Sequence, residues 1–352
     1  MPTSTSWTLP DLHEHLQAAV ELELLVIPPY LCALYSLHPG TNAEAVLIIR
    51  SVVVEEMLHM ILAANVLHAV GGHATVTDPD WVPRYPARIP HHTDSFQVGL
   101  LPFGDEAIEV FLAIENPSYP VATLQAGSDD AAIPRAMELS RTREYPTIGA
   151  FYSAIQEGLC ALDADIGHDA LFTGELARQI GPEHYYASGG RAIVVDDLDS
   201  ALAALEQIVD QGEGDVTTPR TGEKFDQEGN LAHYYRFNEL RHRRRYLADD
   251  APAEPTGAAI EIDLDAVYPM QPNLRVEQLP TAALRETANA FNIVDVRLLR
   301  QIQTAFDGRP EALTQAVGTM FELKKSAIDL LRIPLPDTSA HAGPTFEYPI
   351  MT

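Results

Sequence analysis

Residues 43–70 read AEAVLIIRSVVVEEMLHMILAANVLHAV, and this stretch decides the fold. Apolar side chains recur along it every three or four residues, which predicts an amphipathic helix with one buried face. Glu56 and His59 lie inside that apolar face, next to the small side chain of Ala63. A Glu-x-x-His pair lets one carboxylate and one imidazole meet above the helix surface, as in carboxylate-bridged dimetal bundles. The stretch therefore predicts a bundle helix that binds a metal ion, with a buried salt-bridge network as the alternative.

The preceding helix supplies a second candidate ligand. A helical pattern runs over residues 8–37, and Glu23 falls on its apolar stripe, with Tyr30 seven residues further on. An ionised carboxylate on an apolar stripe is costly unless a cation meets it, so we expect Glu23 to face the same metal site. Glu21 points the other way and is expected to face solvent. A short Pro-Gly turn joins the two helices, which are therefore expected to pack antiparallel.

Two further bundle helices and two long insertions are expected in the first part of the chain. We expect the bundle over residues 1–250, and a linker, C-terminal helices packed on the bundle and an extended tail over residues 251–352. The further bundle helices are predicted at 147–163 and 231–247, and the insertions at about 73–146 and 174–229. Inside the insertions we expect helices at 106–114 and 198–211 and a strand at 192–195. The C-terminal helices are predicted at 281–306 and 311–333.

The third and fourth bundle helices leave alternatives open. Glu157 is the carboxylate away from the ends of the third helix, and at about 100° per residue it lies opposite the apolar stripe. Either this helix is buried on two sides and Glu157 faces the metal, or Glu157 is a surface residue. On the fourth helix His233 shares an apolar face and is favoured as the ligand over Glu239. Asn230 stands where a second Glu-x-x-His pair would need its carboxylate, so a mononuclear or asymmetric centre is an alternative to a dinuclear one.

Composition excludes several classes of protein. The chain has 50 acidic and 23 basic residues, and a net charge of −27 would repel the phosphates of a nucleic acid. It has no apolar run of the roughly 18 residues needed to cross a bilayer and no signal peptide, so we expect a soluble, cytoplasmic protein. Two cysteines exclude a disulfide framework and a thiolate zinc cluster, which leaves 13 histidines and the carboxylates as ligands that suit iron or manganese.

Six separated motifs resemble the ferritin-like proteins related to iminophenyl-pyruvate dimer synthase. They are ELELLVIPPYL (21–31), EEMLH (55–59), TIGAFY (147–152), GGR (189–191), HYYRF (233–237) and GPTFEY (343–348). The resemblance covers nearly the whole chain and implies a mainly α fold, a ferritin-like four-helix bundle with long insertions and additional C-terminal helices. It also implies an iron centre with ligands at Glu23, Glu56, His59, Glu157 and His233. A di-iron centre is the first expectation, and manganese or a mononuclear centre is the alternative.

The same resemblance implies an oxidase that uses O2 or peroxide and acts on a small amino-acid-derived substrate, as in the oxidative coupling of indole-pyruvate imines. The insertions would cover the substrate, with His91, His92 or Arg191 as candidate carboxylate partners. Two alternatives are a non-catalytic ferritin-like protein that stores metal or acts as a scaffold, and a metal-free helical protein. The partners expected are the small-molecule substrate, a biosynthetic partner enzyme and further copies in a homo-oligomer, with no nucleic acid and no membrane.

Overall fold

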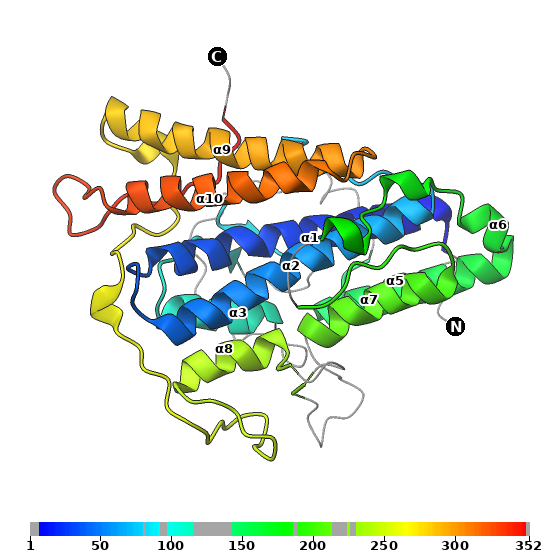
Figure 1. The fold of residues 1–352 in the computed structure, drawn as a ribbon, viewed down its shortest axis with the longest axis horizontal. Coiled ribbons are helices and arrows are strands. Elements are labelled where there is room, and N and C mark those ends of the chain that lie inside the picture. The colour runs from blue at the N-terminus through cyan, green and yellow to red at the C-terminus, as the bar shows by residue number, and fades with distance from the viewer. Residues whose placement is uncertain are drawn as a thin grey trace.

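The computed structural model describes residues 7–79, 82–91, 97–115, 143–185, 189–212, 224–225 and 230–349. Within these residues the protein is mainly helical, as predicted, with the long helices stacked in layers (Figure 1). The helices are α1 (Leu9–Ser36), α2 (Ala43–Ala69), α3 (Asp105–Glu115), α5 (Ile148–Ile166), α6 (His168–Leu171), α7 (Leu198–Gly212), α8 (His233–His242), α9 (Ala282–Phe306) and α10 (Ala312–Leu331). Short 3-10 turns cover Leu176–Arg178, Pro182–His184, Leu264–Ala266 and Val276–Gln278, and strands β1 (Ala87–Arg88) and β2 (Gln97–Val98) pair antiparallel.

Helix α1 is buried around almost its whole circumference. Thr8 caps its N-terminus by accepting a hydrogen bond from the backbone N–H of Asp11 at 3.3 Å. The side chain of Gln17 bonds to the backbone of Thr75 and donates to Glu21 at 3.2 Å, so the segment after α2 covers this side of the helix. Glu21 is therefore buried, and burial raises its pKa to about 8. The expectation that Glu21 faces solvent is wrong, because it treated the helix as having one buried face.

Four helices surround the middle of the bundle. Helix α1 packs along α2, α3 packs along α8, and contacts of α2 with α8 and of α1 with α3 close the group. The third helix of this group is thus α3, which the sequence analysis placed inside an insertion. Helix α5, expected to be the third bundle helix, packs on α1 and on α7, and α7 packs on α2, so these helices close a second four-helix group around the same α1–α2 pair. Helix α7 forms where residues 198–211 predicted it, whereas the strand expected at residues 192–195 is absent from this described segment.

The C-terminal helices α9 and α10 pair with each other at the top of Figure 1, and α10 packs against α1. Both form close to their predicted ranges. By length and composition α1 could span a membrane, but 89% of its most apolar window is buried inside the protein, which is the pattern of a core helix. Helix α8 ends earlier than predicted, at His242, because Arg243 adopts a left-handed backbone conformation with φ of +53°.

Candidate metal centre

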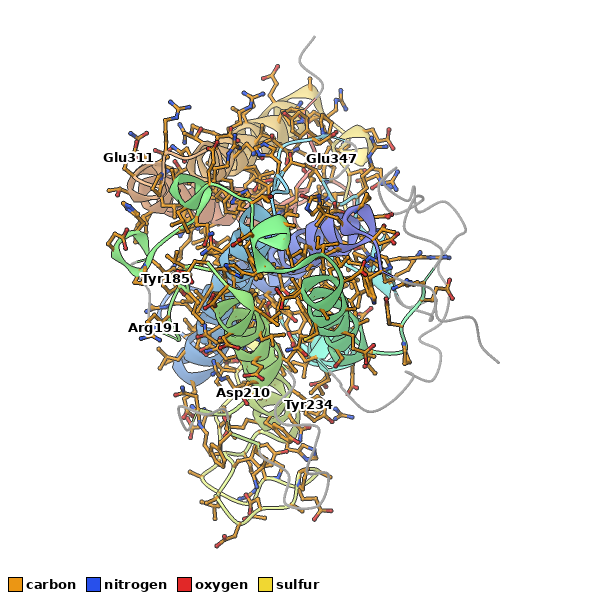
Figure 2. All side chains as sticks on the ribbon, turned by 90° about the vertical axis from the view of Figure 1, so that its right-hand side faces the viewer. Tyr185, Arg191, Asp210, Tyr234, Glu311 and Glu347 are labelled. Carbon is orange, nitrogen blue, oxygen red and sulfur yellow. The ribbon has the colours of Figure 1, made fainter. Side chains whose placement is uncertain are left out.

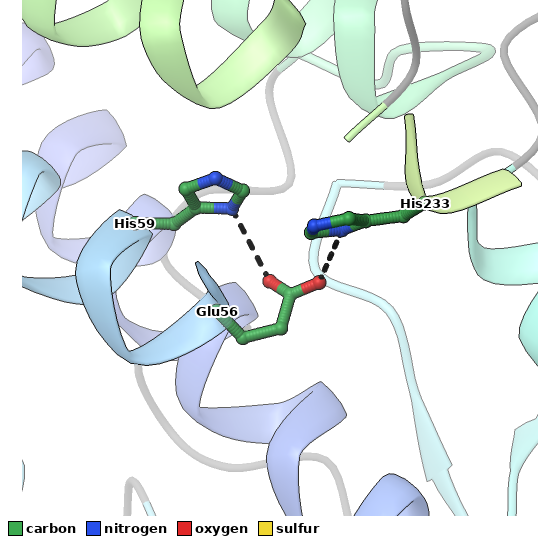
Figure 3. Close-up of side chains that lie close together, drawn as sticks. All are labelled: Glu56, His59 and His233. Atoms are coloured by element: carbon green, nitrogen blue, oxygen red, sulfur yellow. Dashed lines mark ion pairs between the residues drawn. The ribbon is translucent and has the colours of Figure 1, made fainter. Parts of the chain in front are cut away.

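Glu56 lies between two histidines at the middle of the bundle (Figure 3). Its Oε2 atom is 3.4 Å from Nδ1 of His59, and its Oε1 atom is 2.9 Å from Nδ1 of His233. The two imidazole rings face each other, with centroids 5.4 Å apart and planes 26° apart. All three side chains are buried, and one donor atom from each lies within 4.8 Å of the others. Helix α2 supplies Glu56 and His59 one turn apart, and α8 supplies His233 at its first residue.

Each histidine has a second carboxylate beside it, from a different helix. Oε2 of Glu23 on α1 lies 3.7 Å from Nδ1 of His59. Oε2 of Glu115, the last residue of α3, lies 3.7 Å from Nδ1 of His233. The centre therefore has two similar halves, each with one histidine and one carboxylate of its own, and the two halves share Glu56.

Two tyrosines hold the outer carboxylates. Tyr152 on α5 donates a short hydrogen bond to Oε1 of Glu23, and Tyr30 on α1 donates a short one to Oε1 of Glu115. In each carboxylate the other oxygen, Oε2, faces a histidine. The tyrosines thus fix which oxygen each carboxylate turns to the centre.

Hydrogen bonds on the far side of the imidazoles set their tautomers. Nε2 of His59 donates to Oε1 of Gln211 at 3.0 Å, and Nε2 of His233 donates to Oε2 of Glu55 at 2.8 Å. Glu55 in turn accepts from Nη1 of Arg236 at 2.9 Å. Because Nε2 carries the proton in both rings, the lone pair of each neutral imidazole is on Nδ1 and points into the centre. Outer partners of this kind orient metal-binding histidines and increase their basicity.

The donor set fits a pair of divalent cations of the iron or manganese type. Nδ1 of His233 is buried and makes no hydrogen bond of good geometry, although Glu56 is 2.9 Å away, which suits a nitrogen that binds a cation. Three carboxylates with two neutral imidazoles carry a charge of −3, and two divalent cations would bring the sum to −3 + 4 = +1. Carboxylate and imidazole donors are the types that these metals prefer. Carboxylates and histidines on facing helices are also the ligands of dimetal bundles.

Burial and mutual attraction shift the pKa values of the centre. Burial raises the pKa of Glu23 to about 8, and burial together with the charge of Glu56 raises that of Glu115. Burial lowers the pKa of a histidine, but hydrogen bonds with Glu23 and Glu56 outweigh it and raise that of His59 to about 10. The neighbouring carboxylates likewise hold the pKa of His233 well above its usual range. Against the effect of burial, the attraction of His233 and His59 keeps the pKa of Glu56 well below its usual range. The centre therefore favours positive charge, and a bound cation would compete with protons there.

A small cavity of about 20 Å³ adjoins the centre. That volume holds about one water-sized molecule. Its polar lining is Glu23, Glu56, His59, Glu115 and Tyr152, and its apolar lining includes Val26, Ile114 and Ile208.

The structure brings together four of the five predicted ligands: Glu23, Glu56, His59 and His233. The fifth, Glu157, is exposed on α5, because this helix turns its stripe of Tyr152, Ile155 and Leu159 inward. The interpretation of Glu157 as a metal ligand is therefore corrected. Glu115 on α3 lies in the centre as the third carboxylate.

The other candidates lie elsewhere. Glu239 is buried away from the histidines and pairs with Arg245 at 2.7 Å, and Asn230 is exposed. His91 stacks on His15 with ring centroids 5.1 Å apart, and Arg191 projects from the edge of the protein in Figure 2. His92 lies outside the described residues.

Glu115 and Gln211 are the residues that sequence reasoning missed at the centre. Glu115 lies four residues after Phe111 and seven after Ile108, on the buried stripe of α3. Like Glu23, Glu115 is a carboxylate on an apolar helix stripe, but its segment was interpreted as part of an insertion and not as a bundle helix. Gln211 ends the predicted helix at 198–211, and no local signal marked it.

A glycine pair supports the outer partners of both histidines. Gly189 and Gly190 have φ of +96° and +110°, which side chains rarely adopt. The carbonyl of Gly189 accepts a hydrogen bond from Nε2 of Gln211 at 3.1 Å, which turns the amide oxygen of Gln211 toward His59. A Cβ atom on Gly189 would lie 2.6 Å from Oε1 of Glu55.

We expect Gly189→Ala to destabilise the protein by about 1–3 kcal/mol, because it adds backbone strain and displaces Glu55 from His233. Urea unfolding measures the change. The control is Gly318→Ala on α10, where an added Cβ meets nothing within 4 Å. Alanine is favoured over glycine there by up to about 1 kcal/mol. Equal effects of the two substitutions would contradict the tight packing of Gly189 on Glu55.

Comparisons with known proteins agree with the fold described above. A family model described as ferritin-like matches residues 16–242, which include every residue of the centre. Dichlorochromopyrrolate synthase from Lentzea aerocolonigenes is 26% identical over 319 residues, or 83% of this chain, and the match spans 29% of the length of that relative. A solved structure of a ferritin-like protein from Caulobacter vibrioides has a TM-score of 0.59 and 23% identity, covers 97% of this chain and 99% of its own, and shows the fold. Since the family model matches well over half of its residues, the chain belongs to the ferritin-like family.

Proposed function

We propose that this chain is an oxidase that binds a pair of metal ions, and that both ions are iron. Its oxidant is O2 or peroxide, and its substrate is a small amino-acid-derived molecule. The observation that carries the proposal is the pair of similar half-sites that share Glu56. The relative named as a synthase supports a biosynthetic reaction. The resemblance to iminophenyl-pyruvate dimer synthases supports the oxidative coupling of indole-pyruvate imines, and a biosynthetic partner enzyme belongs to the same proposal.

Five side chains would hold the ions. Glu23 and His59 would bind one ion, Glu115 and His233 the other, and Glu56 would contribute one oxygen to each. Bound iron would supply electron pairs for the reduction of O2 or peroxide. The protein contributes orientation: hydrogen bonds hold the rings of both histidines through Nε2 and set the angles of the outer carboxylates before any ion binds.

The inner cavity matches the oxidant in size. About 20 Å³ admits one molecule of the size of water and leaves no room for an organic substrate. The apolar side chains of Val26, Ile114 and Ile208 border this space and exclude bulk water from it. We therefore assign the inner cavity to the oxidant and place the organic substrate outside it.

The test is aerobic turnover by protein loaded with a defined metal. Purified full-length chain is loaded with Fe(II) under nitrogen and is expected to take up about two ions per chain. With indole-3-pyruvate and ammonium as the substrate probe, we expect uptake of O2 and formation of a coupled product, followed with an oxygen electrode and by mass spectrometry.

Zinc provides the matched control, because it takes the same ligands and has no redox chemistry. Zinc-loaded protein is expected to show no O2 uptake. Equal O2 uptake by the zinc and iron forms would contradict the proposal. Two stably bound iron ions with no O2 uptake would favour the alternative of a non-catalytic metal-binding or scaffold protein.

A further inference from the structure

A cleft of about 630 Å³ lies on the outer side of the metal centre. Pockets for small organic ligands have volumes of about 300–1,000 Å³, so this cleft is large enough where the inner cavity is not. Glu55 is part of its wall, and Glu55 accepts the hydrogen bond from His233. One carboxylate therefore separates the cleft from a ligand of the centre.

The cleft contains a cation that has no partner in the described part of the chain. Arg50, on α2, is exposed and forms no hydrogen bond or ion pair with any described residue. The other two arginines of the wall are paired, Arg236 with Glu55 at 2.9 Å, and Arg245 with Glu239 at 2.7 Å and Glu44 at 3.0 Å. These three glutamates offset the charges of Arg236 and Arg245, so Arg50 is the cation of the wall that is left for a ligand. An anion that enters the cleft can therefore pair with Arg50, although the protein as a whole, with a net charge of −27, repels anions.

Arg236 supplies further donors at the floor of the cleft. Its side chain is 8% exposed, and Nη1 donates to Oγ of Ser51 at 3.0 Å and to Oε1 of Glu55 at 2.9 Å. Nε donates to the carbonyl of Leu231. These bonds fix the plane of the guanidinium. Nη2 makes no hydrogen bond to the described residues, so its two N–H groups are available to a ligand oxygen.

The wall of the cleft also has an apolar part, beside the polar residues Ser51 and Asn230. Leu47 is 59% exposed although α2 is otherwise a core helix, and Ile48, Val54 and Leu231 also line the cleft. An exposed leucine beside an unpaired arginine suits a ligand that carries an apolar body and one negative charge. A carboxylate matches the planar donors of arginine, which bind it through two parallel hydrogen bonds.

We propose that this cleft binds a small organic carboxylate with an apolar body. The carboxylate contacts Arg50 and Arg236, and the body packs on Leu47 and Val54. That the ligand is the substrate of the oxidase rests on the proposed function, whereas the binding itself does not. Bound there, the ligand lies one side chain, Glu55, away from His233.

The binding test uses 3-phenylpropionate and the full-length chain in isothermal titration calorimetry. Its neutral analogue 3-phenylpropionamide has the same body without the charge. We expect the carboxylate to bind at least about tenfold more tightly than the amide, since charge-assisted hydrogen bonds to arginine are lost. Metal-free and zinc-loaded protein should give the same dissociation constant, because Arg50 and Arg236 bind the ligand and the metal does not. Equal affinity for carboxylate and amide, or binding only by the zinc-loaded form, would overturn the proposal.

Arg50→Gln is expected to weaken 3-phenylpropionate binding by about tenfold and to leave amide binding unchanged. Arg88→Gln is the matched control, because Arg88 is exposed on β1 and does not line the cleft. Unchanged carboxylate affinity in Arg50→Gln would overturn the site. If carboxylate binding depends on Arg50 but the iron-loaded protein consumes no O2, the cleft stands and the oxidase does not. If turnover occurs with a KM that Arg50→Gln leaves unchanged, the ligand of the cleft is not the substrate.

Discussion

Replacing Glu56 by alanine is expected to lower metal binding in both halves of the centre at once. Each of its two oxygens faces a different histidine, at 3.4 Å from His59 and 2.9 Å from His233. Loss of an outer partner of a metal ligand already costs about 10–100-fold in affinity, so loss of a shared ligand should cost at least about 100-fold for each ion. Anaerobic equilibrium dialysis against Fe(II), followed by elemental analysis, measures both ions.

Single substitutions of the outer carboxylates separate the two halves. Glu23→Ala removes a ligand beside His59 only, and Glu115→Ala removes one beside His233 only. Each is therefore expected to weaken the binding of one ion and leave the other in place. The shared position of Glu56 would be refuted if Glu56→Ala also left one ion bound at its original affinity.

Glu157→Ala is the control for this series. Glu157 is a carboxylate of α5 that points to solvent, whereas its helix neighbour Tyr152 reaches Glu23. Its substitution is expected to leave the metal content unchanged. A loss of iron comparable to that in Glu56→Ala would show that α5, and not α3, supplies the third carboxylate.

Local sequence pattern was sufficient for the ligands that lie on the stripe of a regular helix. Glu23, Glu56 and His59 are polar residues in apolar stripes, and the cost of burying them identified them as candidate ligands, which the structure brings together. Glu115 has the same property on α3. It was missed because the assignment of its segment to an insertion depended on the Pro- and Asp-rich sequence around it, whereas its place in the bundle depends on packing against α8.

Contacts between distant segments explain the other differences. Glu21 is buried by Gln17 and the backbone of Thr75, and the pattern of α1 alone does not show that residues after α2 return to cover it. Gln211 and Glu55 become partners of the histidines only after α7 and α8 dock on α2. Periodicity reports which face of a helix is apolar, but it does not report which segment covers the opposite face.

Replacing Asp295 by asparagine is expected to stabilise the protein at neutral pH and above, and the gain is expected to disappear as the pH falls. Asp295 is 8% exposed on α9 and forms no hydrogen bond or ion pair with the described residues. Burial raises the pKa of Tyr35 and of Tyr85, and the nearby charge of Asp295 adds to this rise in both tyrosines. Burial raises the pKa of Asp295 itself from 3.8 to about 7. Between those pH values the folded protein keeps a proton that the unfolded chain releases, so this group lowers stability as the pH increases through that range.

The difference in pKa between the folded and unfolded states also sets the size of the expected gain in stability. The difference between the two pKa values sets an upper bound of about 4 kcal/mol above pH 7, and burying a neutral amide costs about 1–2 kcal/mol of that gain. Asp295→Asn should therefore gain about 2–3 kcal/mol over the parent protein at pH 8 and lose about 1 kcal/mol at pH 4, where the cost of the buried amide remains and the parent carboxyl is neutral, as measured by urea unfolding at both pH values. Asp329 on α10, whose side chain is 46% exposed and pairs with Lys325 at 2.7 Å, provides the comparison. Its substitution by asparagine should change stability by less than about 1 kcal/mol at either pH. A gain in Asp295→Asn that is equal at pH 4 and pH 8 would mean that packing, and not the buried charge, limits stability where α9 meets α1.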